Sequence, residues 1–275
     1  MMGRQRLPGR PVVLVFAGLD PSGGAGLAAD ILAIAAQGVH ALPVITALTV
    51  QDNDRVFGVE AVAPAMLCRQ AQALIAKIAI DAVKIGIPGS AANAAVIAQL
   101  IAQLRLVRPD LPVVLDPVLA SGHGDLLSKG DAVPALTPLL PVTTLIVPNG
   151  PEALALGGAE SLRAQGCKNV LLTGGHGEGE VIVNRWCDSA GGEREWRWPR
   201  LPGAFHGSGC TLASAIAARL ALGHPLAEAL ALAQSYCHAA LAGAYAIAPG
   251  QGIPQRFIEQ GKHHAWTVSG HPQLG

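Results

Sequence analysis

Short apolar runs alternate with helix-like segments along the whole chain, and this alternation is what most constrains the fold. Each run has the length of a buried strand, and strands are expected at residues 12–18, 44–50, 82–86, 113–116, 144–147 and 169–173. Buried strands that alternate with helices form a parallel sheet covered on both faces. The sequence therefore predicts an α/β fold with one doubly wound, mostly parallel sheet flanked by helices.

The segments between these strands are expected to be mainly helical. Helices are expected at residues 27–37, 64–78, 91–106, 129–140, 207–222 and 226–246. A hairpin is expected between residues 181–184 and 195–198. No internal repeat or low-complexity linker divides the chain, so we expect one domain over residues 1–275, with loose tails at 1–11 and about 256–275.

The charge and cysteine content argue against several kinds of partner. Lys+Arg and Asp+Glu are both 19, so there is no basic excess to suggest a nucleic acid or a membrane surface. No apolar run is long enough to cross a bilayer. The 5 cysteines include no CxxC pair, which favours a reduced, cytoplasmic protein. We therefore expect a small molecule as the partner.

The segment from His206 to Leu212 carries the clearest chemical signal. Apolar residues recur every four positions from Leu212 onward, so a helix is expected to begin within residues 207–209. The unpaired N–H groups and the dipole of a helix start attract an anion, and small residues let it approach. Cys210 falls in the first turn, where a thiolate is favoured and the pKa falls. This combination suits phosphoryl transfer, and the alternative is a buried helix start with Cys210 in the core.

Polar residues at the ends of the expected strands form a second signal. Gln51, Asp116 and Asn149 each lie where a buried strand ends, and open α/β sheets bind ligands at such ends. Turns rich in Asn and Asp, and helix capping by Asn149 and Glu152, explain the same residues without a ligand. Asp30 differs, because it lies on the apolar face of a helix and needs a partner there. It is either a ligand-binding residue or a buried cap.

Two common catalytic motifs are absent from the sequence. There is no GxxxxGK[ST] phosphate loop and no GxSxG nucleophile turn. Residues 24–29 fit GxGxxA between a strand and a helix, which is the one hint of a dinucleotide enzyme. Pro21 in the turn, Gly23 beside Gly24 and the apolar-face Asp30 do not belong to that fingerprint. The dehydrogenase interpretation is therefore disfavoured.

Six motifs, in order along the chain, resemble those of one kinase family. They are residues 18–26 followed by Ala29-Asp30, residues 44–51, Lys84-Ile85-Gly86, Asp116-Pro117-Val118, Pro148-Asn149 with Glu152, and residues 206–212. Together they are similar to the hydroxymethylpyrimidine/phosphomethylpyrimidine kinases of thiamine biosynthesis, which have the ribokinase-like fold. The resemblance runs from about residue 12 to about residue 255.

The resemblance implies a two-step kinase that uses ATP and Mg²⁺. The first step would phosphorylate the hydroxymethyl oxygen of 4-amino-5-hydroxymethyl-2-methylpyrimidine, and the second would convert the monophosphate to the diphosphate. Cys210 would accept the proton of the attacking hydroxyl, at a position where the wider superfamily usually has an aspartate. The anion hole would be formed by the N–H groups of Gly207, Ser208, Gly209 and Cys210. A homodimer is implied as well.

The resemblance also assigns the remaining site residues. It places Gly18, Asp30, Gln51 and Ile87 in the pyrimidine pocket, Asn149, Thr173 and Gly174 at the nucleotide, and Glu152 and Asp116 at Mg²⁺ and the phosphates. A carboxylate and an amide together can offer donor and acceptor groups to an aminopyrimidine edge.

The chain departs from the family pattern at several positions. Ile87 stands where many members have Met, Thr173 stands where many have Lys, and a lysine is missing before the Ser-Gly of the loop at 120–126. The segment between Leu156 and Cys167 looks shortened. Fewer positive charges are expected to affect nucleotide contacts and the second step more than the pyrimidine pocket. Two alternatives remain open: a pyridoxal kinase of the same fold, and a pyrimidine-binding protein without catalysis.

Overall fold

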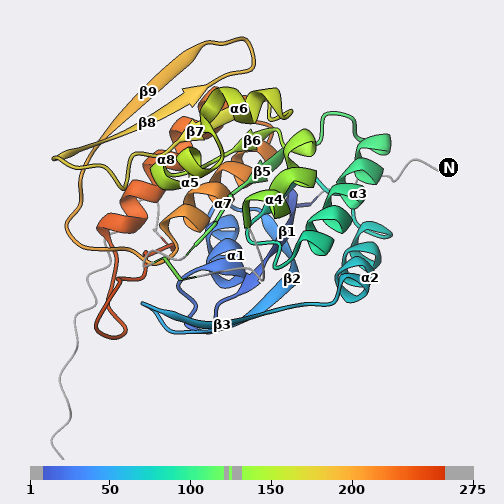
Figure 1. Cartoon of the computed structure of the whole chain (residues 1–275), viewed down its shortest axis with the longest axis horizontal. Coiled ribbons are helices and arrows are strands. Elements are labelled where there is room, and N and C mark those ends of the chain that lie inside the picture. The colour runs from blue at the N-terminus through green and yellow to red at the C-terminus, as the bar shows by residue number, and fades with distance from the viewer. Residues whose placement is uncertain (1–8, 121–123, 126–131, 258–275) are drawn as a thin grey trace, which may run out of the picture.

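The computed structural model describes residues 9–120, 124–125 and 132–257, and in this part of the chain nine strands form a single sheet (Figure 1). The strand order is β3-β2-β1-β4-β5-β6-β7-β8-β9. The parallel strands are β1 (Val12–Leu19), β2 (His40–Gln51), β4 (Ala82–Ile85), β5 (Val113–Leu115), β6 (Leu145–Ile146) and β7 (Asn169–Leu172). The predicted strands and the doubly wound α/β fold are confirmed.

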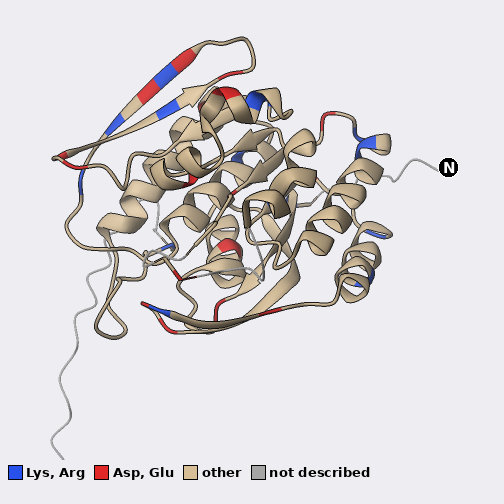
Figure 2. Ribbon diagram, in the orientation of Figure 1, with Lys and Arg blue, Asp and Glu red and all other residues tan. Residues whose placement is uncertain are grey.

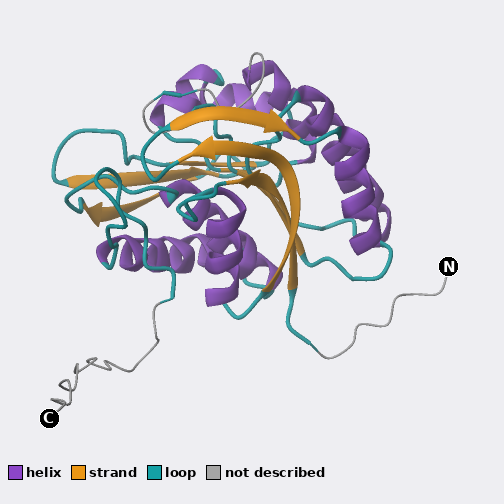
Figure 3. Cartoon of the chain, turned by 90° about the horizontal axis from the view of Figure 1, so that it is seen from below, coloured by secondary structure: helices purple, strands orange, loops and turns teal. Residues whose placement is uncertain are grey.

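Helices cover both faces of this sheet (Figure 3). One face carries α1 (Gly26–Ala36), α7 (Ser208–Ala221) and α8 (Leu226–Ala242). The opposite face carries α2 (Pro64–Ile75), α3 (Ala91–Val107), α4 (Ala132–Leu136) and α6 (Gly158–Ala164). The predicted helices other than 129–140 are confirmed to within a few residues at their ends.

The side-chain alternation of β1 explains why its sequence is apolar throughout. Leu14 and Phe16 pack into the core beneath α2 and α3, whereas Val13 and Val15 pack into the core beneath α1 and α7. All four side chains have no exposed surface. Successive residues of a strand point to opposite faces, so a sheet buried on both sides needs an unbroken apolar run.

Antiparallel strands close both edges of the sheet. The predicted hairpin is confirmed as β8 (Val181–Cys187) and β9 (Glu193–Pro199). At the other edge, β3 (Val56–Ala61) pairs with β2. The sequence analysis did not predict β3. Gly58 and the partly exposed side chains of β3 give it no clear apolar pattern.

Charged residues are sparse and are concentrated on the β8–β9 hairpin (Figure 2). Arg185 and Glu195 form an exposed cross-strand ion pair at 2.8 Å. An edge strand that alternates charges in this way resists pairing with another chain. The hairpin therefore closes the sheet and presents a solvated edge.

The predicted helix at 129–140 was only partly correct. Residues 126–131 and the 121–123 part of the predicted loop lie outside the described residues. Beyond them the chain forms the short α4 and then a 3₁₀ helix over Thr137–Val142. Pro134, Pro138 and Pro141 remove backbone donors here, so a continuous α-helix cannot form. Within the described residues, no helix is both long and apolar enough to cross a membrane.

Candidate active site

A cavity of about 530 Å³ opens at the carboxyl ends of the parallel strands, beside the start of α7. The predicted site residues that line it are Gly18, Gln51, Ile87, Asp116, Asn149, Glu152, Thr173, Gly207, Ser208, Gly209 and Cys210. These residues come from the ends of six parallel strands and the starts of α5 (Gly150–Ala155) and α7, so the parallel topology brings them together. Asp30 and Gly174 are not among the lining residues.

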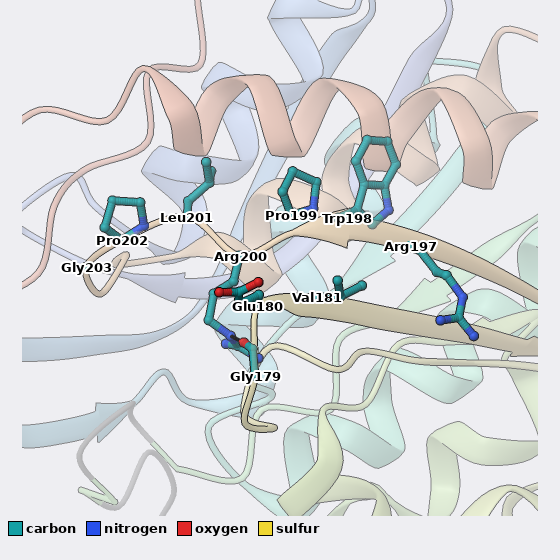
Figure 4. Close-up of a pocket in the computed structure, with 10 residues that line it drawn as sticks. All are labelled: Gly179, Glu180, Val181, Arg197, Trp198, Pro199, Arg200, Leu201, Pro202 and Gly203. Carbon is teal, nitrogen blue, oxygen red and sulfur yellow. Dashed lines mark hydrogen bonds between the residues drawn. The ribbon is translucent and has the colours of Figure 1, made fainter.

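A more open groove lies on the β8–β9 hairpin beside this cavity (Figure 4). It is lined by residues 179–181 and 197–203, with Arg200 between its two sides. The Arg200 guanidinium donates to the carbonyl oxygens of Gly175, Gly177 and Gly179 at 2.8, 2.7 and 2.6 Å. Arg200 therefore fixes the loop after β7. None of the strand-end polar residues lines the groove, so the cavity is the candidate active site.

Gly207 shapes the start of α7. It is the N-cap residue and has a φ of 76°, which favours glycine. A Cβ atom at this position would lie 2.1 Å from the carbonyl oxygen of Gly24. Glycine therefore lets the turn at 23–26 close against the first turn of α7. The N–H groups of that first turn have no partner within the helix, and they border the cavity as the predicted anion site.

Replacing Gly207 with alanine should impair both stability and activity. The positive φ alone costs about 1–2 kcal/mol, and the contact with Gly24 adds to it. We expect kcat/KM to fall at least about tenfold as the turn moves. Gly223→Ala is the matched control, because Gly223 has a φ of 90° but no atom within 4 Å of the added Cβ. Urea unfolding and steady-state kinetics check both variants, and equal activity in the two would contradict the role of Gly207.

Cys210 lines the cavity as predicted, but the predicted direction of its pKa was wrong. Burial is the largest influence and raises the pKa of the thiol, the charge of Lys84 opposes it, the charges of Asp116 and Asp30 add to it, and the net pKa is about 12. The helix start was the only influence considered from the sequence, whereas the surroundings of the thiol outweigh it. Cys210 is therefore a protonated thiol at neutral pH, hydrogen-bonded to Asp116.

Asp30 lies outside the cavity because a buried lysine pairs with it. Lys84 Nζ lies 2.9 Å from an Asp30 oxygen, and both side chains have no exposed surface. The Ser214 hydroxyl donates a second hydrogen bond to Asp30 at 2.7 Å. The prediction that Asp30 lines the pyrimidine pocket is thus corrected: its carboxylate meets its partners in the core.

Lys84 itself reaches the cavity, which the sequence analysis did not foresee. Its Nζ lies 3.7 Å from Asp116, and Lys84 is one of the lining residues. Burial lowers the pKa of Lys84, but the charge and hydrogen bond of Asp30 and the charge of Asp116 oppose burial, and the net pKa is raised. Lys84 therefore remains charged. A lysine in a buried strand and an aspartate on an apolar helix face each need a charged partner. This requirement could have predicted from the sequence that Lys84 pairs with Asp30.

Asp116 and Glu152 form the acidic side of the cavity. Glu152 opens α5 (Gly150–Ala155) in a capping box with Asn149, with both hydrogen bonds at 2.9 Å. Burial raises the pKa of Glu152 to about 8, and the charge of Asp116 contributes. Burial also raises the pKa of Asp116, although Lys84 opposes it. Capping and cavity lining are thus compatible roles for Asn149 and Glu152.

These two carboxylates fit a divalent cation. The Asp116 Oδ2 atom is buried and has no hydrogen-bond partner in the described part of the chain, and the Lys84 ammonium lies 3.7 Å from it. A cation would offset the repulsion between Asp116 and Glu152. The described residues hold no group of three or more His, Cys, Asp or Glu suited to a metal, so water and phosphate oxygens would complete the ligand shell. Such a mixed shell of oxygens is what Mg²⁺ prefers.

Asp20 and His206 form a pair that the sequence analysis did not assign. His206 Nε2 lies 2.8 Å from Asp20 Oδ2 and lines the cavity. The buried Asp20 also accepts hydrogen bonds from the N–H groups of Ser22 and Ala25, both at 2.7 Å. The Ser22 hydroxyl also donates to Asp20, at 2.9 Å. The pair therefore joins the turn before α1 to the segment before α7.

Asp20 should make the stability of the protein depend on acid pH. Burial raises the pKa of Asp20, but His206, Ser22 and Ala25 outweigh it and the net pKa is lowered. The stabilisation is therefore complete above the unfolded pKa of about 3.9 and is lost as the pH falls through the lower folded pKa. Asp20→Asn should cost about 1–3 kcal/mol at pH 7, with the difference shrinking below about pH 4. Urea unfolding at several pH values measures the difference in the free energy of unfolding between Asp20→Asn and wild type. A difference that does not change with pH would contradict the role of Asp20. Asp110→Asn, at an exposed position, is the control.

Gly18, Ile87 and Thr173 form other parts of the cavity wall. A Cβ on Gly18 would lie 2.6 Å from Ile87 Cδ1, so glycine lets the Ile87 side chain pack across the end of β1. Thr173 lies at the end of β7, with its N–H donated to Pro148 at 2.9 Å. Gly174 faces β8 instead, since its N–H donates to Asn184 at 3.0 Å. Gly174 is not among the residues that line the cavity, although Thr173, Gly175 and Asn184 are, so its contact with the nucleotide stays a prediction.

Comparison with known proteins agrees with this geometry. The family model described as phosphomethylpyrimidine kinase matches residues 20–255. A hydroxymethylpyrimidine/phosphomethylpyrimidine kinase from Rhizobium meliloti is 37% identical over 261 residues, covering 88% of this chain and 94% of that protein. The phosphomethylpyrimidine kinase structure from Clostridium difficile 630 has a TM-score of 0.71 and 32% identity, covering 83% of this chain and 98% of that one. The Bacillus subtilis pyridoxal kinase, solved as an ADP complex, has a TM-score of 0.79 and 25% identity, covering 90% and 97%. The chain belongs to the phosphomethylpyrimidine kinase family.

Proposed function

We propose that this phosphotransferase moves the γ-phosphoryl group of ATP to 4-amino-5-hydroxymethyl-2-methylpyrimidine and then to the resulting monophosphate, in thiamine biosynthesis. The observation that carries the proposal is one cavity in which the start of α7, the Cys210 thiol and the pair of carboxylates meet. The relatives with this family's name cover most of the chain. The reaction needs positioning and charge stabilisation more than covalent chemistry, and these residues supply both.

The pyrimidine is proposed to bind at the ends of β1, β2 and β4. Ile87 packs beside the Gly18 backbone and offers an apolar surface to the ring. Gln51 lies at the edge of the same cavity and can both donate to and accept from the aminopyrimidine. Asp30 is excluded from this role by its burial with Lys84.

Cys210 is proposed to accept the proton of the attacking hydroxyl. A thiolate with a pKa near 12 is a strong acceptor but a rare species at neutral pH. The transfer is therefore expected late, as the new P–O bond forms and the hydroxyl becomes more acidic. The Lys84 ammonium stabilises the thiolate, and the N–H groups of Gly207, Ser208 and Gly209 hold the transferring phosphoryl group.

Asp116 and Glu152 are proposed to hold Mg²⁺ together with Asn149, which orients Glu152. The ion would neutralise the charge on the β- and γ-phosphates. Thr173 borders the nucleotide without the charge that many relatives have there, so the second phosphorylation is expected to be the slower step. The homodimer and the cytoplasmic location stay predictions.

A pyridoxal kinase is the second candidate, because a pyridoxal kinase has the TM-score of 0.79 reported above. The two functions are separated by measuring kcat/KM for the hydroxymethylpyrimidine and for pyridoxal with the same enzyme. We expect the pyrimidine to be preferred. A higher value for pyridoxal would reassign the substrate, and binding of the pyrimidine without ATP consumption would favour the non-catalytic alternative.

A further inference from the structure

Arg256 contacts two segments next to the cavity, the turn at 23–26 and the first turn of α7. Its Nε donates to the Thr211 hydroxyl at 3.0 Å, and its Nη2 donates to the carbonyl oxygen of Gly24. A Cβ atom on Gly207 would lie 3.0 Å from Nη2, so the guanidinium lies directly against the N-cap of α7. The Tyr236 hydroxyl donates to the Arg256 carbonyl at 2.8 Å and anchors the segment. A single side chain thus links the turn at 23–26 to the first turn of α7.

The burial of Arg256 is unusual for its charge. The residue is 2% exposed, although the sequence analysis placed it at the start of a loose tail. In the described part of the chain no carboxylate forms an ion pair with it, and its buried Nη1 has no hydrogen-bond partner. A buried charge without a partner is costly. The charge of Asp30 acts on Arg256, but Asp30 forms its ion pair with Lys84, so the guanidinium adds positive charge to the region behind the predicted anion site.

We infer that Arg256 is a positioning residue for phosphate binding, which holds the turn at 23–26 against α7 and adds positive charge behind the N–H groups of Gly207 to Cys210. The inference rests on the proposed function, since it assumes that the phosphates bind at this helix start. The family match ends at residue 255, one residue before Arg256.

The test compares two ligands of different charge by calorimetry. Arg256→Met should weaken binding of the Mg²⁺ complex of a non-hydrolysable ATP analogue at least about tenfold, because a nearby charge and the loop geometry are both lost. Binding of the uncharged hydroxymethylpyrimidine should change less than about twofold. Arg256→Lys should fall between the wild type and the Met variant, because an ammonium keeps the charge but cannot reach both partners in the same way. Equal weakening of both ligands, or of neither, would overturn the inference.

A matched control separates this role from general stability. Arg105 is half-buried and also donates to a carbonyl and a threonine hydroxyl, those of Leu111 and Thr144, but it belongs to α3, on the face of the sheet opposite α7. Arg105→Met should leave both affinities unchanged. If Arg256→Met does not fold, Thr211→Val removes one partner of the guanidinium and should weaken only the nucleotide. Unchanged nucleotide binding in both Thr211→Val and Arg256→Lys would then overturn the inference.

The same data distinguish this inference from the proposed function. Wild-type protein that binds both ligands but transfers no phosphate would contradict the proposed function alone. Wild-type protein that binds no nucleotide would contradict both.

Discussion

Cys210→Ala should bind both substrates and lose most of its turnover, with kcat lowered about 10²–10⁴-fold. The variant removes the proposed proton acceptor but leaves the N–H groups at the start of α7, which bind phosphate through the backbone. KM for ATP should therefore change little, and the loss should appear in kcat. Alanine also suits a helix, so the fold should be kept.

Cys68 supplies the control for this variant. It is a half-buried thiol on α2, away from the cavity, so Cys68→Ala should keep wild-type kinetics. Single-turnover measurements show whether the chemical step has slowed. Wild-type turnover in Cys210→Ala would remove Cys210 as the proton acceptor and leave transfer to the phosphate oxygens or to Asp116.

Lys84→Met should destabilise the protein by about 3–5 kcal/mol, the largest effect expected on folding. Lys84 and Asp30 have no exposed surface, and Lys84 also faces Asp116 at 3.7 Å. Without the ammonium, two buried carboxylates lose their counter-charge. Activity should fall as well, because Lys84 also stabilises the Cys210 thiolate.

A double-mutant cycle isolates the contribution of the ion pair. Lys84→Met with Asp30→Asn should be less destabilised than the sum of the two single changes, by about 1–3 kcal/mol, because the second change removes an unpaired charge. Urea unfolding at pH 7 measures all four proteins. The exposed Lys77→Met should stay within about 0.5 kcal/mol of wild type. Additive effects would mean that the pair is not coupled.

The fold and most of the cavity could be predicted because they depend on local patterns. The helix at 207–222 follows from apolar spacing, and Gln51, Asp116 and Asn149 share one sheet edge because parallel strands end together. Asp30 could not be placed, since its partner is 54 residues away in the sequence and only the neighbouring positions of β1 and β4 bring them together. The pKa of Cys210 was misjudged for a similar reason: the helix start is local, but the burial that raises the pKa most, and the carboxylates of Asp116 and Asp30, come from the packing of other elements.

The edge strand β3 and the C-terminal segment around Arg256 also could not be predicted from sequence patterns. The strand β3 is partly exposed and interrupted by Gly58, so its pairing with β2 shows in the hydrogen bonds but not in the residue pattern. Arg256 follows a segment rich in Gly and Pro that is typical of an irregular tail. Its burial depends on Thr211 and Gly24, which are distant in the sequence.

A product-resolved time course tests the central claim most directly. The pure protein is incubated with Mg·ATP and the hydroxymethylpyrimidine, and the monophosphate, the diphosphate and the ATP consumed are measured together. We predict that the monophosphate appears first and then declines as the diphosphate forms, with two ATP consumed for each diphosphate. A reaction that forms neither product while the pyrimidine binds would contradict the assignment of this cavity as a kinase active site.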